Sequence, residues 1–492
     1  MFLIFDTETT GLPLKWNAPL TDADNWPRCV QIAWQLHDKD GSCISHEDYL
    51  VLPNGFSVPY DAEKIHGIST ELAKEKGLPL EEVLEKFQLR LQQCEFVGGH
   101  NVKFDLNIMG AEFLRINGKN PLENLPIIDT CNEETANLCQ LPGRGGKFKL
   151  PKLSELYAHL FETQFEEAHN ATADVEATAR CFFELFRQAR LEPKALKNRR
   201  EIIYHLKEVL EAPVQGIGLK HENLKAASAQ LLALANSEEE PTKTLSHAEE
   251  EVLQKATFVH LHTHSQYSVL QSTSRIQDLI QTAADYQMPA VALTDHANLM
   301  GAFHFIKAIK KHNADLEEGQ THLKPILGCE FFVCEDHQDR SRRDNGYQIV
   351  FIAKNKKGYE NLSKMSSIAY TQGFYYVPRI DKKIVEQYKS DLIVLTGNLY
   401  GEVPSKILNI GDTQAEEALL WWQGQFGKDL YIELMRHQQE DEQRANAVLL
   451  EFAKKHQIKI LATNNSYYTS KNDANAHDIL LCVKEGEKQT TP

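Results

Sequence analysis

Two acidic residues, Asp6 and Glu8, stand on alternate positions at the end of an apolar run that begins at Phe2. In a β-strand, residues i and i+2 point to the same face, so these carboxylates would lie together at a sheet edge. Neighbouring carboxylates repel each other unless a cation lies between them. Mg²⁺ and Mn²⁺ prefer oxygen ligands, and a pair of such ions is a common device for cleaving phosphodiesters. The spacing alone leaves two interpretations open, a metal site and a strand that ends in a solvated acidic turn.

Three further residues with useful chemistry stand where secondary elements are expected to begin. Asp105 follows a short apolar stretch and precedes a helical pattern over residues 106–116. His169 lies in a loop before a second amphipathic pattern at 175–186, and Asp174 falls within the first turn of that helix. The sequence therefore offers four carboxylates and one histidine, each at the end of a secondary element.

This set of residues resembles the His-subtype DEDD exonucleases, the epsilon-like proofreading exonucleases of bacterial replication. The motifs that carry the resemblance are FDTETTG at 5–11, IHGI at 65–68, GHNVKFD at 99–105, IDT at 128–130 and HNATAD at 169–174. The resemblance covers residues 1–190. It implies an α/β, ribonuclease H-like exonuclease domain with a mixed sheet.

The same resemblance implies roles for individual residues in removing the 3′-terminal nucleotide of DNA. Two Mg²⁺ or Mn²⁺ ions would be held by Asp6, Glu8, Asp105 and Asp174. His169 would act as general base on the attacking water, since the ordinary pKa of histidine lies near neutrality. The alternative for His169 is a surface loop residue that caps the following helix. Residues expected to line the nucleotide site are Thr7, Thr9, His66, Asn101 and Phe104.

A second group of potential metal ligands begins with His262 and His264, which share a face if they lie on a strand. From about residue 257 to the end, the chain resembles the PHP domain (polymerase and histidinol phosphatase) that opens the alpha subunit of bacterial DNA polymerase III. The motifs are FVHLHTHS at 258–265, ALTDH at 292–296, GCE at 328–330 and ATN at 462–464. Such domains are distorted (β/α)₇ barrels with metals at the C-terminal ends of the strands.

Metal-binding members of this family need more ligands than the chain supplies. Gln271, Gln348, Asn465 and Tyr467 stand where those members carry an aspartate, a histidine, an aspartate and a histidine. Asparagine and glutamine are much weaker ligands than carboxylates or imidazoles. We therefore expect the PHP metal to be absent or partial and the domain to be a scaffold. The residues left for one residual ion are His262, His264, Asp295, His296 and Glu330, with His437 as a further candidate.

Residues 191–256 are expected to form a helical and acidic linker between an exonuclease domain at 1–190 and a PHP domain at 257–492. An acidic stretch at 237–251 ends this segment. Residues 230–234, Gln-Leu-Leu-Ala-Leu, are weakly similar to the peptides that bind the sliding clamp, but an ordinary amphipathic helix is the favoured interpretation.

Composition limits the class of protein. The 492 residues suffice for two or more domains, and 42% apolar residues suffice for sizeable cores. No apolar run reaches the length of a membrane span, and no secretory signal opens the sequence, so a cytoplasmic protein without a membrane partner is expected. Nine scattered cysteines without a CxxC pair indicate neither a disulfide framework nor a zinc knuckle. The formal charge of −16 is unusual for a nucleic-acid-binding protein.

Taken together, the two resemblances predict the N-terminal part of a DNA polymerase III alpha subunit with a 3′–5′ proofreading exonuclease fused in front. The polymerase residues are not in this sequence, so DNA-directed DNA polymerase activity would belong to the full-length protein. The implied partners are a DNA 3′ end and other holoenzyme subunits, including the sliding clamp. Three alternatives stay open: a stand-alone DNA or RNA exonuclease with an appended PHP domain, a PHP phosphoesterase, and an inactive adaptor.

Overall fold

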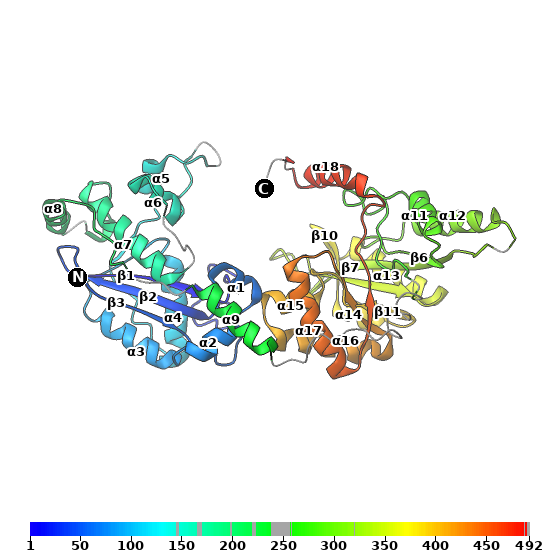
Figure 1. Ribbon diagram of the computed structural model, residues 1–492, viewed down its shortest axis with the longest axis horizontal. Helices are drawn as coiled ribbons and strands as arrows, with labels where there is room; N and C mark the ends of the chain where they lie inside the picture. Colours follow the sequence, from blue (N-terminus) through cyan, green and yellow to red (C-terminus); the bar gives the residue numbers. More distant parts are fainter. Residues whose placement is uncertain are drawn as a thin grey trace. The chain divides into compact units, whose positions relative to one another are not determined.

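The computed structural model divides into two compact units, residues 1–241 and 242–492, and each is described here by itself (Figure 1). It describes residues 1–143, 147–164, 170–196, 199–218, 223–237, 256, 258–318, 320–486 and 488–489. Within these ranges, no helix combines the length and the apolar character needed to cross a lipid bilayer.

The first unit is built on a mixed sheet in the strand order β3-β2-β1-β4-β5. Its strands are β1 (Phe2–Thr9), β2 (Cys29–His37), β3 (Cys43–Leu50), β4 (Phe96–Gly99) and β5 (Ile127–Asp129). The pairs β1–β2 and β2–β3 are antiparallel, whereas β1–β4 and β4–β5 are parallel. The central strand, β1, is the one that carries the predicted acidic pair.

Helices cover both faces of this sheet, with α7 on one face and α3 and α4 on the other (Figure 1). The helices of the unit are α1 (Tyr60–His66), α2 (Thr70–Lys76), α3 (Leu80–Leu91), α4 (Lys103–Asn117), α5 (Glu133–Cys139), α6 (Leu153–Phe161), α7 (Ala171–Arg187), α8 (Arg200–Val209) and α9 (Leu224–Ser237). Phe2 and Ile4 pack with α7, while Leu3 and Phe5 pack with α3 and α4. Fully burying each such side chain is worth roughly 1.5–3 kcal/mol, so this alternation fixes which face each residue of β1 takes.

Part of the predicted linker packs onto the first unit. Leu206 of α8 joins the core beneath α7, and Leu224 of α9 packs with α2. The buried Ser228 hydroxyl donates to the carbonyl of Gly67 at 2.7 Å and accepts from the Ser69 N–H at 3.0 Å. In the clamp-like stretch, Leu231 packs against the same apolar cluster, and the side chains from 232 to 234 lie outside the described residues. The boundaries of the linker stay a prediction.

The second unit contains a larger mixed sheet, in the order β13-β12-β11-β8-β7-β10-β9 with β6 paired to β7. Its strands are β6 (Ala290–Leu293), β7 (Lys324–Cys334), β8 (Tyr347–Ala353), β9 (Phe374–Tyr375), β10 (Val377–Asp381), β11 (Leu392–Leu395), β12 (Leu430–Leu434) and β13 (Lys459–Ala462). The segment 260–264 bonds to β6 and to the residues that follow β13: the Ala292 N–H donates to the His260 carbonyl at 3.0 Å and the Ser466 N–H to the His262 carbonyl at 3.2 Å. The predicted α/β class and the curled barrel-like sheet are confirmed, with β8 antiparallel to its neighbours.

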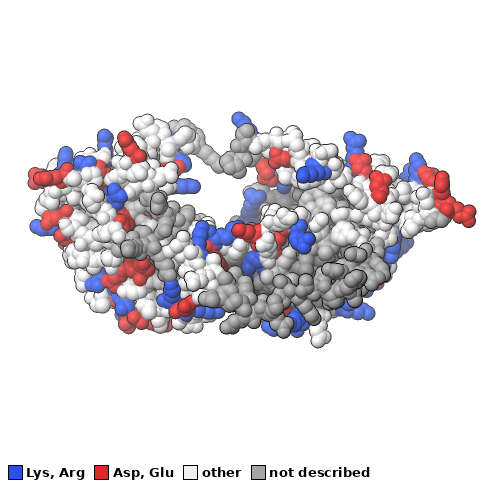
Figure 2. All heavy atoms as spheres, viewed as in Figure 1, with Lys and Arg blue, Asp and Glu red and all other residues white. Residues whose placement is uncertain are grey.

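Helices surround this sheet and bury the largest apolar core of the unit, which includes Trp422. They are α11 (Ile276–Asp285), α12 (Ala302–Ala314), α13 (Lys356–Thr371), α14 (Lys382–Tyr388), α15 (Glu402–Asn409), α16 (Asp412–Phe426), α17 (Glu440–His456) and α18 (Ala474–Glu485). Figure 2 shows Lys and Arg side chains interspersed with Asp and Glu over the face in view. On that face the acidic excess is mixed with basic side chains rather than separated from them.

Candidate metal centres

The predicted acidic pair lies at the C-terminal end of β1, on the face that α7 covers. Asp6 and Glu8 continue the register of Phe2 and Ile4, and Asp174 enters the same space from the first turn of α7. Each of these three carboxylates offers an oxygen within 4.8 Å of the other two. The structure thus brings together three residues that are far apart in sequence, in a geometry that could hold a divalent ion.

Asp105 reaches the cluster from the opposite side of the sheet. It lies in the first turn of α4, where the helix dipole favours negative charge. Its Oδ1 accepts hydrogen bonds from the Thr7 N–H at 3.0 Å and the Thr7 hydroxyl at 2.7 Å. Thr7 therefore positions this carboxylate, and the nucleotide contact that the family resemblance implies for it stays a prediction.

Burial and mutual repulsion make this cluster costly to ionise without a cation. Burial, then Asp105, Asp174 and Glu8, raise the pKa of Asp6 well above its usual value. Burial and the neighbouring aspartates raise the pKa of Glu8 to about 8. Burial raises the pKa of Asp105 to about 7, even though Thr7 stabilises its charged form. A divalent ion would supply the missing positive charge, and the oxygen donors suit a hard cation such as Mg²⁺ or Mn²⁺.

The other predicted residues of the first unit make hydrogen bonds with their own neighbours. His66 is buried and its Nδ1 accepts from the Ile68 N–H at 3.1 Å. Asn101 has a left-handed backbone (φ 60°), and its N–H donates to Asp129 at 2.8 Å. The Thr9 hydroxyl donates to the Gly11 carbonyl at 2.7 Å, which closes the end of β1.

Two further predicted residues complete the picture of this site. Phe104, directly before Asp105, is half-buried and packs against the core beneath α4. His169, the predicted general base, lies outside the described residues. Its neighbour Asn170 caps α7 through a hydrogen bond from the Thr172 N–H at 3.1 Å.

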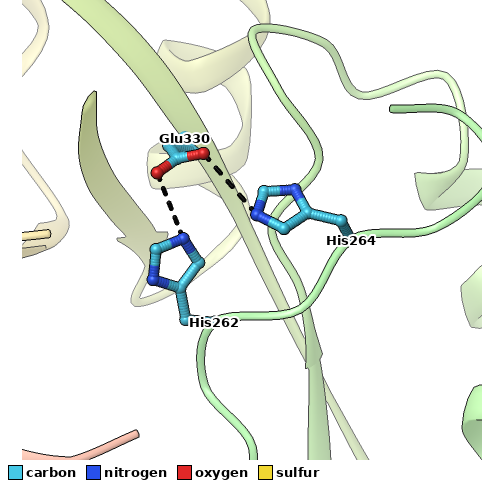
Figure 3. Close-up of side chains that lie close together, drawn as sticks. All are labelled: His262, His264 and Glu330. Carbon is cyan, nitrogen blue, oxygen red and sulfur yellow. Dashed lines mark ion pairs between the residues drawn. The ribbon is translucent and has the colours of Figure 1, made fainter. Parts of the chain in front are cut away.

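The second candidate centre is a buried network in which histidine and glutamate alternate (Figure 3). His262 lies between two carboxylates, with Nε2 at 3.2 Å from Glu330 and Nδ1 at 2.9 Å from Glu433. Glu330 also pairs with Nδ1 of His296 at 2.7 Å and lies 3.5 Å from Nε2 of His264. His262, His264 and Glu330 offer ligand atoms within 4.8 Å of one another.

This network supplies its own positive charge. Burial alone would lower the pKa of His262, but Glu433 and Glu330 outweigh it and raise that pKa to about 10. Although burial opposes ionisation, His296 and His262 hold the pKa of Glu330 well below its usual value. Burial, together with the neighbouring His296, lowers the pKa of His264 well below its usual value, so the His264 imidazole is neutral at pH 7. His262 is thus a cation held between two buried carboxylates.

Hydrogen-bonded polar side chains occupy other predicted positions around the network. Asn465 lies 2.9 Å from Nε2 of His264, and the Tyr467 hydroxyl lies 3.1 Å from Nε2 of His296. Asp295 accepts from the Ser265 and Ser268 hydroxyls at 2.8 and 2.7 Å. Asn465 and Tyr467, two of the four residues that replace expected metal ligands, are therefore hydrogen-bonded to histidines that remain, and the described donor set fits a polynuclear metal centre poorly.

Two further predicted residues, Gln348 and His437, have partners outside the group formed by His262, His264 and Glu330. Gln348 accepts from the Asn398 amide at 2.8 Å. His437 pairs with Glu442 at 2.5 Å and is not part of the ligand group formed by His262, His264 and Glu330.

Sequence reasoning missed Glu433, which lies in β12 and contacts His262 across 171 positions of the chain. The available signal was an acidic residue inside the apolar strand Leu-Tyr-Ile-Glu-Leu. A buried carboxylate in such a strand requires a partner, because an unpaired buried charge is very costly. The identity of that partner depends on the tertiary fold, and the strand pattern alone could not supply it.

Comparison with known proteins finds a family model that matches part of each unit. Residues 3–182 match the exonuclease family, and residues 260–437 match the PHP domain family. Curated relatives of the PHP region include the DNA polymerase III subunit alpha of Borreliella burgdorferi, 37% identical over 240 residues, and that of Aquifex aeolicus, 38% identical over 237 residues. These matches cover 48% and 46% of this chain, and the chain spans about a fifth of the length of each relative, 20% in both cases.

Among solved structures, the zinc-bound form of the E. coli exonuclease I complex with single-stranded DNA is 23% identical and covers 41% of each chain, with a TM-score of 0.30. A second structure of exonuclease I is 20% identical, covers 42% of this chain and 43% of that one, and has a TM-score of 0.31. At these TM-scores neither likeness carries an argument about this chain.

Proposed function

We propose that the first unit is a 3′–5′ exodeoxyribonuclease that uses two divalent ions, Mg²⁺ or Mn²⁺. The observation that carries the proposal is the meeting of Asp6, Glu8 and Asp174 within 4.8 Å, with Asp105 positioned beside them by Thr7. Four buried or half-buried carboxylates at one sheet edge need cations, and paired cations at such an edge suit phosphodiester cleavage. The match of residues 3–182 to the exonuclease family supports the same reaction class.

The protein residues divide the work of this reaction. Asp6, Glu8 and Asp174 would hold one ion, and Asp105 would complete the binding of the second. The bound ions supply an activated water and positive charge where negative charge develops on the phosphate. His169 is proposed to take the proton of the attacking water, a role that fits the near-neutral pKa of an ordinary imidazole. The N–H and hydroxyl of Thr7 keep Asp105 oriented throughout.

The PHP unit is proposed to be a scaffold within a longer protein. Its buried cation, His262, and its hydrogen-bonded Asn465 and Tyr467 favour a structural role over phosphoester hydrolysis. The DNA polymerase III alpha relatives of this region suggest that the full-length protein is a replicative DNA polymerase in the bacterial cytoplasm. Its proposed partners are a DNA 3′ end and other replicase subunits, with the sliding clamp among them.

The test is degradation of 5′-labelled single-stranded DNA by the purified chain with Mg²⁺, in which successive loss from the 3′ end gives a ladder. Asp6→Asn should abolish the ladder, because it removes one ligand charge at nearly constant volume. His264→Gln in the second unit is the matched control and should leave the ladder intact. Loss of activity in His264→Gln with full activity in Asp6→Asn would move the chemistry to the PHP unit. A parallel RNA substrate separates a DNA-specific enzyme from a general exonuclease.

A further inference from the structure

A group of exposed apolar side chains follows directly after the strand that carries Asp6 and Glu8. Leu12 and Leu14 are each 73% exposed, and Trp16 is 55% exposed. Single exposed apolar residues are ordinary, but three within five positions of one loop make an apolar patch that is a candidate binding surface. This patch is called the β1–β2 loop patch below.

The loop that presents this patch is held in place by buried polar groups. The buried Asn25 side chain accepts from the Lys15 N–H at 2.7 Å and donates to the Lys15 carbonyl at 3.0 Å. The Trp26 indole donates to the Pro19 carbonyl at 3.0 Å, and Arg115 of α4 donates to the Ala23 carbonyl at 2.9 Å. These bonds fix both sides of the loop, so the exposure of its apolar tip is a property of the fold.

Trp16 packs near Phe104, the residue directly before Asp105. Its ring centroid lies 5.9 Å from that of Phe104, with 52° between the ring planes. Phe104 directly precedes Asp105, whose carboxylate is bound by Thr7 between Asp6 and Glu8 on β1. The aromatic pair is therefore joined through the backbone of Phe104 to a carboxylate of the proposed cleavage site.

Each aromatic residue of the pair has a lysine beside it in sequence. Lys15 precedes Trp16 and Lys103 precedes Phe104, and both lysines are exposed. Aromatic side chains next to basic ones are the usual means of binding single-stranded nucleic acid, since bases stack on the rings and phosphates pair with the cations. The carboxylate cluster would repel phosphates without its metal ions, so these lysines also oppose that repulsion.

We propose that Trp16, together with Phe104, is a stacking platform for a base near the 3′ end of single-stranded DNA. The platform makes Trp16 a positioning residue that favours unpaired over paired 3′ ends, because a base within a duplex cannot leave its stack without an energetic penalty. This inference rests on the exonuclease function proposed above for the same site.

Trp16 also provides a direct binding signal. Of the five tryptophans, Trp26, Trp34 and Trp422 are buried and Trp421 is half-buried, so Trp16 is the most exposed. Titration of oligo(dT) with Ca²⁺ in place of Mg²⁺, an exchange intended to limit cleavage, should quench tryptophan fluorescence. The quench should disappear in Trp16→Phe while binding persists, because phenylalanine still stacks.

The kinetic test compares Trp16→Ala, Trp16→Phe and a control, Tyr204→Ala. Tyr204 is an exposed aromatic residue on α8. Arg199, the residue before α8, pairs with Glu95, which also pairs with the amino group of Met1 at the start of β1. The control therefore lies near the end of β1 that is opposite to Asp6 and Glu8. We expect Trp16→Ala to raise KM for oligo(dT) about tenfold, the usual effect of losing one base stack, while kcat changes little. Trp16→Phe should retain most of the affinity, and Tyr204→Ala should match the wild type.

The outcomes separate this inference from the proposed function. Wild-type degradation of oligo(dT) with an unchanged KM in Trp16→Ala, or a fluorescence quench that survives in Trp16→Phe, would overturn the stacking role alone. If Trp16→Ala lowered the activity on single-stranded and on fully paired 3′ ends equally, that result would also overturn the stacking role. Absence of degradation by the wild type would instead contradict the exonuclease function.

Discussion

The carboxylate cluster of the first unit and the histidine–glutamate network of the second bury similar groups but balance their charge differently. At the first site, Asp6, Glu8 and Asp174 repel one another, and the pKa of Glu8 rises to about 8. At the second, His262 lies between Glu330 and Glu433 and its pKa rises to about 10. Like charges at the first site require an outside cation, whereas the second contains one.

This difference teaches that a count of potential ligands is a poor guide to a metal site. Both regions offer three residues with ligand atoms within 4.8 Å. Only the first lacks a positive side chain among them; at the second, the opposite charges of His262 and Glu330 offset the cost of burial. The charge that remains after all contacts are counted distinguishes the two sites, and the predictions below test that distinction.

The largest expected effect comes from removing the internal cation. His262→Ala removes the imidazole that pairs with both Glu330 and Glu433, so Glu433 loses its only histidine partner and Glu330 keeps only His296 and His264. Breaking a buried ion pair in this way typically costs about 3–5 kcal/mol. Hydrogen exchange of the full chain should show that protection is lost in β12 and unchanged in β1. His322→Ala, at an exposed position of the same unit, is the control and should leave both strands unchanged. Full protection of β12 in His262→Ala would contradict the claim that His262 is a stabilising cation between Glu330 and Glu433.

A graded effect of comparable size is expected from pH. Since the folded pKa of His262 is raised from about 6.5 to about 10, its contribution is complete below pH 6.5 and is lost as the pH rises through 10. The slope is about 1.4 kcal/mol per pH unit within that window. Calorimetry of wild type and Glu433→Gln should therefore show a stability difference that shrinks from pH 7 to pH 10. A constant difference would mean that His262 is not the titrating group.

The first unit should also lose stability as pH rises, but divalent ions should restore it. Glu8 has a folded pKa raised to about 8, so its stabilising protonation is complete below its ordinary value near 4.5 and is lost as the pH rises through 8. Saturating Mg²⁺ at 100 times its Kd should return about 2.7 kcal/mol at alkaline pH and less at pH 6. The measurement is hydrogen exchange of β1 with Mg²⁺ or EDTA. If Mg²⁺ increased the hydrogen-exchange protection of β12 as much as that of β1, the result would contradict the proposed difference between the two sites.

The smallest effect is expected at Thr7, which orients a carboxylate and does not itself bind metal. Thr7→Val removes the 2.7 Å hydroxyl contact to Asp105 and keeps the shape and the N–H bond. Loss of such a supporting contact usually lowers activity or metal affinity about 10–100-fold. The Mg²⁺ concentration for half-maximal exonuclease activity should rise accordingly, and Thr9→Val on the same strand should change it less.

Local pattern was enough to predict some parts of the site, and family resemblance or tertiary structure was needed for others. The alternation along β1 predicted that Asp6 and Glu8 share a face, because strand geometry depends only on neighbouring positions. Bringing Asp105 and Asp174 to the same edge rested on family motifs. Thr7 was expected to touch nucleotide, and its bond to Asp105 becomes visible only in three dimensions.

In the second unit, the missing ligands were readable from sequence, but what replaces them was not. Asn465 and Tyr467 were recognised as substitutions, yet their hydrogen bonds to His264 and His296 connect segments about 170–200 positions apart. Glu433 escaped notice for the same reason. The packing of α9 against α2 likewise depends on contacts that a helical pattern does not specify.

Mn²⁺ titration of the full chain, followed by electron paramagnetic resonance, tests the central claim most directly. The wild type is compared with Asp6→Asn and with His264→Gln, which removes a neutral histidine and leaves the His262 clamp intact. We expect Asp6→Asn to lose the tight Mn²⁺ binding and His264→Gln to retain all of it. Retained binding in Asp6→Asn together with loss in His264→Gln would show that the second centre is the one that holds metal.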